Sequence, residues 1–83
     1  MTDRPCYCYT CHTAYGSRGI ASHRAAHMRA GEEATIRIPS YGTHRYVPDP
    51  DSPGRWRAVI PVVGAELDAL DEERSARERR RHP

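Results

Sequence analysis

The chain has 83 residues, and it contains no lysine, asparagine, glutamine or phenylalanine. All thirteen basic residues are therefore arginine. Lysine, asparagine and phenylalanine have AT-rich codons, whereas the abundant arginine, alanine, glycine and proline have GC-rich codons. The composition indicates a GC-rich bacterial or phage genome, so the arginine content by itself does not identify a function. The absence of asparagine and glutamine also removes the usual side chains that read adenine.

Long apolar runs are absent as well. The longest one, residues 58–63, is interrupted by Pro61, and no apolar segment follows the first five residues. A transmembrane helix needs about 20 apolar residues, and a secretory signal needs an apolar stretch near its start. The sequence therefore predicts neither a membrane span nor an export signal, and we expect a cytoplasmic protein.

The apolar core is expected to be small, because only 37% of the residues are hydrophobic and 29% are charged. This length allows one small domain and excludes a large enzyme. Such a domain usually needs a disulfide, a metal or a partner for stability. The odd number of cysteines, three, argues against a disulfide scaffold, and five histidines beside them favour a metal.

Charge is distributed unevenly, although the net charge is only +2. Residues 1–31 carry +3, residues 32–64 carry 0 and residues 65–83 carry −1. Gly31 and the turn-forming cluster 49–54 interrupt the chain, and they divide it into parts 5–31, 32–63 and 64–83. The positive excess therefore lies in the part that contains the cysteines.

Regular structure is predicted in each part. In the first, a helix is expected to begin with Ser17 as N-cap and to end at Gly31. In the second, alternation around residues 36–38, a turn at 39–42 and strands at 43–47 and 56–60 predict a short antiparallel sheet of two or three strands.

The third part is predicted to be a charged helix from Ala65. Val63, Leu67 and Leu70 are spaced to share one face, but no apolar stripe continues beyond them. Pairs four residues apart, such as Glu73 with Arg77, are expected on a solvated surface. We expect deletion of residues 74–83 to leave folding intact.

The most informative pattern is C-x2-C-x11-H-x3-H, formed by Cys8, Cys11, His23 and His27. Two thiolates on a tight turn and two imidazoles one helical turn apart can bind one tetrahedral ion from both sides. The pattern resembles the C2H2 zinc finger over residues 6–31. The resemblance implies a ββα fold, one structural Zn²⁺ in a closed site, and Tyr15 and Ile20 packed beneath the metal.

Two departures from this family are visible. Eleven residues separate Cys11 from His23 where the common spacing is twelve, and Cys6 stands where the family usually has an aromatic residue. Cys6 and His12 are alternative ligands, although Cys6 is too close to Cys8 for the usual turn and His12 directly follows a ligand. Of the other histidines, His44 and His82 are interpreted as isolated surface residues.

A candidate nucleic-acid surface follows from helical geometry. At 100° per residue, Arg18, Ser22, Ala25 and Arg29 form a stripe that points away from the metal ligands. The family resemblance would place the base-reading positions at Gly16, Gly19 and Ser22, which are poor readers. The sequence therefore predicts phosphate-led binding of weak specificity, and the alternative is that the stripe is only a solvated face.

A second candidate surface is Arg55-Trp56-Arg57, because an aromatic side chain between cations can stack on a base. The competing interpretation places Trp56 in the core of the sheet with Ala58 and Ile60, and it turns both arginines outward with Val59. Together with the finger helix, the predicted nucleic-acid-binding residues are Arg18, Ser22, Arg24, Arg29, Arg55 and Arg57.

The sequence thus predicts an α+β protein with a zinc-stabilised ββα finger, a short antiparallel sheet and a C-terminal helix. Its expected function is nucleic-acid binding, with duplex DNA favoured over RNA, in a regulatory or accessory role. The alternative is a protein-interaction adaptor, including a homodimer through the C-terminal helix. We expect no enzyme, because an HNH-type nuclease site would need asparagine and a spare histidine–acid pair near the cysteines. The oligomeric state is left open.

Overall fold

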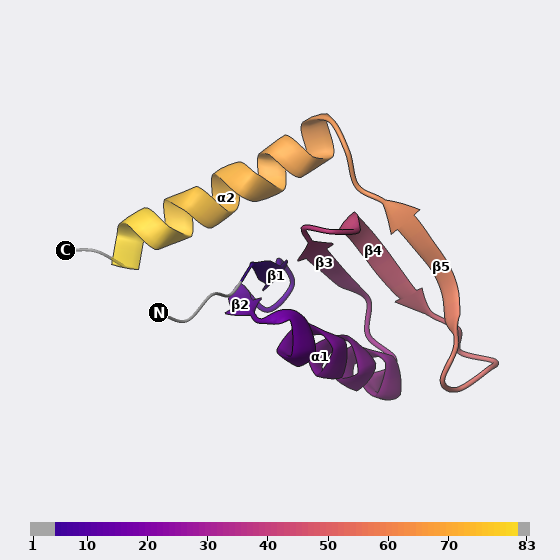
Figure 1. Cartoon of the computed structure of the whole chain (residues 1–83). Coiled ribbons are helices and arrows are strands. Elements are labelled where there is room, and N and C mark those ends of the chain that lie inside the picture. Colours follow the sequence, from indigo (N-terminus) through magenta and orange to yellow (C-terminus); the bar gives the residue numbers. More distant parts are fainter. Residues whose placement is uncertain (1–4, 82–83) are drawn as a thin grey trace.

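The computed structural model describes residues 5–81, so the expectations for residues 1–4 and for His82 lie outside it. The described chain forms, in order, β1 (Cys6–Cys8), β2 (Thr13–Tyr15), α1 (Ser17–Ala30), β3 (Ala34–Ile38), β4 (Gly42–Pro48), β5 (Trp56–Pro61) and α2 (Ala65–Arg81). Figure 1 shows the two helices on either side of the strands. No helix within residues 5–81 has the length and apolar character needed to cross a membrane.

One antiparallel sheet in the order β2-β1-β3-β4-β5 runs through the chain. β1 pairs with β2 on one side and with β3 on the other, where Cys8 lies opposite Ile36. The predicted strands at 36–38, 43–47 and 56–60 are confirmed, but the sheet has five strands because the β1–β2 hairpin adds to them. The finger segment and the later strands therefore share one sheet.

α1 covers one face of this sheet and buries the main core. Ile20 and Ile36 are 2% and 0% exposed and belong to one cluster with Cys6, Cys8, Ala34 and Tyr46. Tyr15 packs against the same cluster. The predicted positions of Ile20 and Tyr15 in the core are thus confirmed, and the core extends beyond the finger into β3 and β4.

The sequence predicted the C-terminal end of α1 correctly but not its N-terminal cap. The N-cap is Gly16 and has no side-chain cap hydrogen bond, so the prediction of Ser17 as cap is wrong. Gly31 is confirmed as the C-terminal cap, because its φ of 71° is left-handed. Its N–H donates to the Met28 carbonyl, and the Glu32 N–H donates to the His27 carbonyl.

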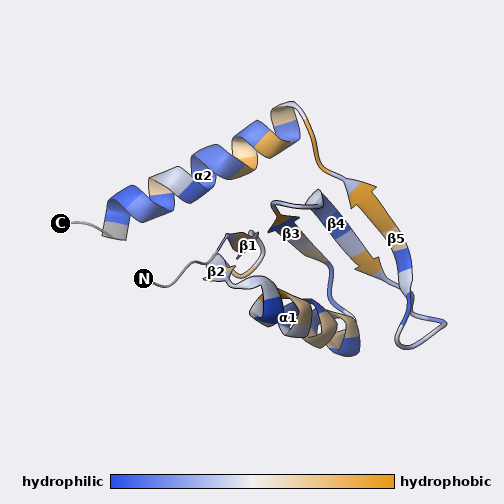
Figure 2. Ribbon diagram, in the orientation of Figure 1, coloured by the Kyte–Doolittle hydropathy of each residue, from blue (hydrophilic) through white to orange (hydrophobic). Residues whose placement is uncertain are grey.

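α2 packs on the opposite face. Tyr7 and Tyr9 alternate with Cys6 and Cys8, and therefore point away from α1. The Tyr9 hydroxyl donates to Asp71 Oδ1 at 2.5 Å, and the Arg74 guanidinium lies 4.0 Å from the centre of the Tyr7 ring. Figure 2 shows that most of α2 is hydrophilic. Polar contacts thus attach α2 to the sheet. The sequence had predicted only a solvated surface for this helix.

A bulge in β5 changes which residues face the core. The register shifts between Val47 and Pro48, so Trp56 pairs with Pro48 while Ala58 pairs with Val47. Trp56 therefore packs on Tyr46 at 5.2 Å between ring centres. The prediction that Trp56 shares a face with Ala58 and Ile60 is wrong, although its packing against the core is confirmed.

Candidate metal centre

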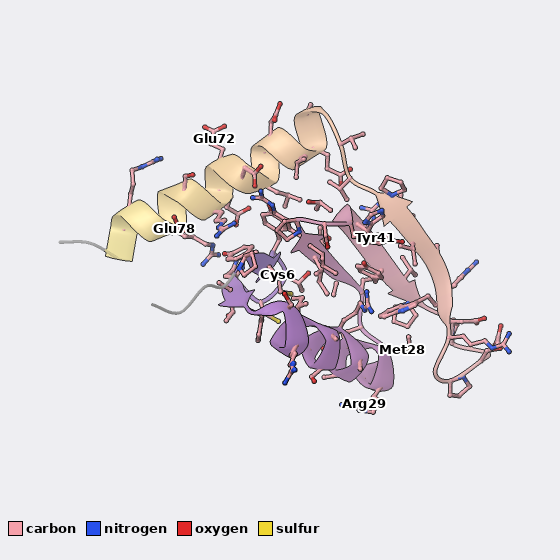
Figure 3. All side chains as sticks on the ribbon, in the orientation of Figure 1. Cys6, Met28, Arg29, Tyr41, Glu72 and Glu78 are labelled. Atoms are coloured by element: carbon pink, nitrogen blue, oxygen red, sulfur yellow. The ribbon has the colours of Figure 1, made fainter. Side chains whose placement is uncertain are left out.

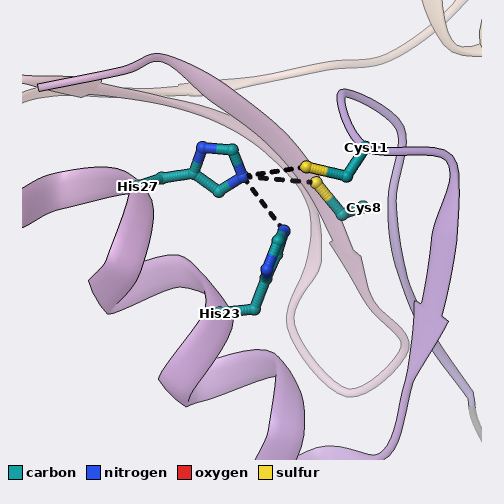
Figure 4. A group of neighbouring side chains, drawn as sticks. All are labelled: Cys8, Cys11, His23 and His27. Atoms are coloured by element: carbon teal, nitrogen blue, oxygen red, sulfur yellow. Dashed lines mark hydrogen bonds between the residues drawn. The ribbon is translucent and has the colours of Figure 1, made fainter. Parts of the chain in front are cut away.

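Four side chains with metal-binding atoms converge between the β1–β2 hairpin and α1 (Figure 4). Cys8 is the last residue of β1, Cys11 lies in the hairpin turn, and His23 and His27 are one turn apart on α1. Their ligand atoms all lie within 4.8 Å of one another. The predicted set Cys8, Cys11, His23 and His27 is therefore brought together by the fold.

The separations match the size of a tetrahedral ion. His23 Nε2 and His27 Nε2 are 3.0 Å apart, and His27 Nε2 lies 3.3 Å from Cys11 Sγ and 3.8 Å from Cys8 Sγ. Zinc–nitrogen bonds of about 2.0 Å and zinc–sulfur bonds of about 2.3 Å give tetrahedral edges of about 3.4–3.8 Å. These residues can hold one metal ion with small side-chain adjustments.

The electrostatic environment shows how an ion would change the site. Burial is the largest cause that raises the pKa of Cys8 to about 11, so the thiol keeps its proton at neutral pH without a cation. Burial and the neighbouring His27 lower the pKa of His23, which favours the neutral imidazole that binds metals. A bound cation would displace the thiol protons, because the thiolate is the ligand form.

The surroundings of the ligands also fix their orientation. The Tyr15 ring stacks on the His23 ring at 4.4 Å between centres. His27 is 7% exposed, and its Nδ1 atom has no hydrogen-bond partner among residues 5–81 but lies 3.6 Å from Glu32 Oε1. This carboxylate stands on the side of the imidazole opposite the metal-binding atom, where metal-binding histidines usually have an acceptor.

The alternative ligands Cys6 and His12 are not members of this cluster among residues 5–81. Cys6 is 2% exposed and packs in the core (Figure 3). His12 lies next to Cys11 but has a φ of 56°, and its side chain lines cavities beside α2. Neither residue therefore replaces a member of the predicted set in this fold.

The residues predicted to contact nucleic acid occupy three places. Arg18, Ser22 and Arg29 are exposed on α1, and Arg29 points away from the sheet in Figure 3. Arg29 also lines a cavity of about 250 Å³ together with Arg55. Arg57 is exposed on β5. The fold thus brings Arg29 and Arg55 to one groove.

Arg24 differs from the other predicted contacts because its guanidinium contacts a side chain of the sheet. Its guanidinium lies 5.2 Å from the centre of the Tyr46 ring, and Nη1 donates to the Tyr46 hydroxyl at 3.4 Å. It is only half-exposed. Arg24 therefore braces α1 against β4.

One arrangement was not visible in the sequence. His12, Arg77 and Arg80 line a single cavity, although more than sixty residues separate the histidine from the arginines. No spacing rule links them, because their proximity depends on how α2 crosses the sheet. The only available signal was the arginine-rich end of α2, which also fits a solvated helix.

Comparisons of the chain with protein-family models, with curated proteins and with solved structures found no match. The case for a metal centre therefore rests on the ligand spacing in the sequence and on the geometry of the four side chains.

Proposed function

We propose that the chain binds one structural Zn²⁺ through Cys8, Cys11, His23 and His27. The convergence of two thiols and two imidazole Nε2 atoms supports zinc, because zinc accepts this mixed donor set in tetrahedral geometry. Four protein ligands fill the coordination sphere, so the site has no open position for a substrate. A stabilising role follows from this closed geometry.

The metal proposal is tested by the zinc content of the reduced protein and by the visible spectrum after Co²⁺ substitution. We expect one zinc per chain and the absorption of tetrahedral cobalt with thiolate ligands. Cys11→Ala should abolish this spectrum, whereas Cys6→Ala should retain it, because Cys6 lies outside the ligand cluster. A folded, reduced protein with almost no zinc would contradict the proposal.

We further propose that the protein binds duplex nucleic acid, preferably DNA, through the outer surface of α1. The observation that carries this proposal is the position of the exposed Arg18, Ser22 and Arg29 on a helix whose inner surface carries His23 and His27. Metal binding would hold that helix rigidly against the sheet. Guanidinium groups at both ends of α1 suit contact with phosphates.

Weak sequence specificity is expected from the residues available on this surface. Gly16, Gly19 and Ser22 provide little for hydrogen bonding to base edges. Arg24, the additional arginine on α1, is held by Tyr46. Contacts from Arg55 and Arg57 would add charge and no direct readout of bases.

Fluorescence anisotropy with a random DNA duplex at several salt concentrations tests this function. We expect micromolar binding that weakens steeply with salt and requires zinc. Arg18→Ala/Arg29→Ala should reduce both the affinity and the salt dependence. Arg37→Ala/Arg79→Ala, which removes the same charge from exposed positions elsewhere, is the matched control. No binding at low salt would overturn the proposal.

A protein-interaction adaptor is the second candidate, and the exposed apolar residues of β5 favour it. Val59 and Ile60 are 39% and 38% exposed on this edge strand, and Val63 is 71% exposed. Leu67 and Leu70 are half-buried, and the homodimer through the C-terminal helix stays a prediction. Binding to a protein through β5 would depend little on salt, which distinguishes it from nucleic-acid binding.

A further inference from the structure

A second cavity lies between α2 and the β1–β2 hairpin, away from the outer surface of α1. Its volume is about 420 Å³, which is within the range of ligand-binding cavities. The lining residues are Tyr7, His12, Thr13, Ala14, Arg77, Glu78 and Arg80. The cavity therefore combines residues of the hairpin with the last turns of α2.

Positive charge dominates this lining, with two arginines against one glutamate. Glu78 lies on the side of α2 that faces the hairpin, as Figure 3 shows, but its Oε1 is 3.2 Å from Arg74 Nε. Its charge is thus already balanced. Arg77 Nε lies 3.5 Å from Glu73 Oε1, so its charge is balanced in the same way. Arg80 Nε donates to the Ala76 carbonyl at 3.4 Å and has no ion-pair partner among residues 5–81, so the net positive charge of the lining comes from Arg80. The two arginines are three residues apart and share a helical face.

His12 adds a hydrogen-bonding group to the same cavity. Its φ of 56° lies in the left-handed region, which is uncommon for residues other than glycine. The half-buried imidazole lines the cavity and has no hydrogen-bond partner among residues 5–81. This position leaves a ring nitrogen available to a ligand.

We propose that the cavity binds a phosphate group of a nucleic-acid backbone through Arg77, Arg80 and His12. The inference rests on the proposed nucleic-acid function and extends it to α2. Guanidinium groups pair with phosphate oxygens through two parallel hydrogen bonds, which favours phosphate as the ligand. Arg77 and Arg80 then act as a second contact for the duplex, separate from Arg18 and Arg29.

The short distance between the cavity and α1 favours a nucleic-acid backbone over a free phosphate ester. Thr13 lines the cavity at one end of β2, and α1 begins just after the other end. A strand of three residues spans only about 10 Å. Each strand of a duplex carries one phosphate for about every 3.4 Å of helix axis. Because β2 is the edge strand of the sheet, a duplex that runs along this edge would pass both the start of α1 and the cavity.

The first experiment measures duplex binding against salt for the full-length, zinc-loaded protein. The slope of log affinity against log salt falls by about 0.9 for each phosphate contact that is lost, so Arg77→Ala/Arg80→Ala, which removes the contact to the one phosphate in the cavity, should reduce it by about 0.9. Arg37→Ala/Arg79→Ala should change the slope little. His12→Gly should weaken binding while it keeps the backbone, because glycine readily adopts the same φ. Equal slopes for both double variants would overturn the inference.

The second experiment titrates inorganic phosphate into the protein and follows the NMR signals of His12, Arg77 and Arg80. A saturable, phosphate-dependent shift of the His12 signal that is lost in Arg77→Ala/Arg80→Ala supports the cavity. A His12 signal that responds to phosphate equally in both proteins, or in neither, overturns it. If only Arg18→Ala/Arg29→Ala weakens duplex binding, the inference fails while the proposed function stands. Phosphate binding without any duplex binding would overturn the proposed function and support a site for a free phosphate ester.

Discussion

At the scale of single residues, His27 has one ring nitrogen directed at the other candidate ligands and a carboxylate close to its second ring nitrogen. Nε2 faces the other ligands, while Nδ1 is buried and lies 3.6 Å from the Glu32 carboxylate. Glu32 directly follows Gly31, whose left-handed conformation ends α1. The glycine cap therefore also directs the chain so that a carboxylate can approach the ligand.

Glu32→Ala should weaken zinc binding by about 10-fold or more, because carboxylates that orient metal-binding histidines commonly contribute this much. Competition with a chromophoric chelator would measure the affinity. Glu33→Ala removes the same charge from the next residue and is the matched control. Equal affinities of the two variants would show that Glu32 does not orient His27.

Tyr9 predicts a dependence of stability on alkaline pH. Burial, followed by the hydrogen bond to Asp71, raises its pKa to about 12. The folded state thus favours the neutral phenol, and this stabilisation is complete below the ordinary pKa of about 10 and is lost as the pH rises toward 12. In chemical denaturation, Tyr9→Phe should lose less stability than the wild type over that interval. An identical decrease in both proteins would contradict the assignment.

At the scale of elements, α2 is a polar helix that covers Tyr7 of β1 and contacts Tyr9 just after it. Arg74 covers Tyr7 and pairs with Glu78, so deletion of residues 74–83 should now reduce stability, against the expectation from the sequence. A partly buried cation–π contact contributes about 1–2 kcal/mol. Thermal denaturation of this deletion and of a shorter one, residues 79–83, measures the effect. Equal melting temperatures would show that Arg74 contributes nothing.

Local patterns identified most elements, whereas their assembly depended on long-range contacts. The strand at Ala34–Ile38, the cap at Gly31 and the Glu73–Arg77 pair followed from alternation, glycine chemistry and helical spacing. The convergence of the four candidate ligands could be predicted because their spacing is set by one turn and one helix. The pairing of β1 with β3 and the bulge beside Pro48 carry no comparable local signal.

At the scale of the whole molecule, the candidate metal site and the sheet share one core. Cys8 is both a proposed ligand and a fully buried core residue opposite Ile36 in β3. Ile20 joins the same cluster from α1. The ligands are therefore embedded in the structure that also holds β3 and β4, and stability should be coupled across it.

Removal of the metal should consequently unfold more than residues 6–31. Zinc contributes about 10–16 kcal/mol to the folding of small fingers, which is comparable to or larger than the total stability of most domains. After chelation, hydrogen exchange should accelerate at the amides of Ile36 and Tyr46 as well as in α1, in one cooperative transition. Cys11→Ala should produce the same pattern without a chelator. Continued protection of β3 and β4 while α1 exchanges freely would instead show that the later strands form an independently stable unit.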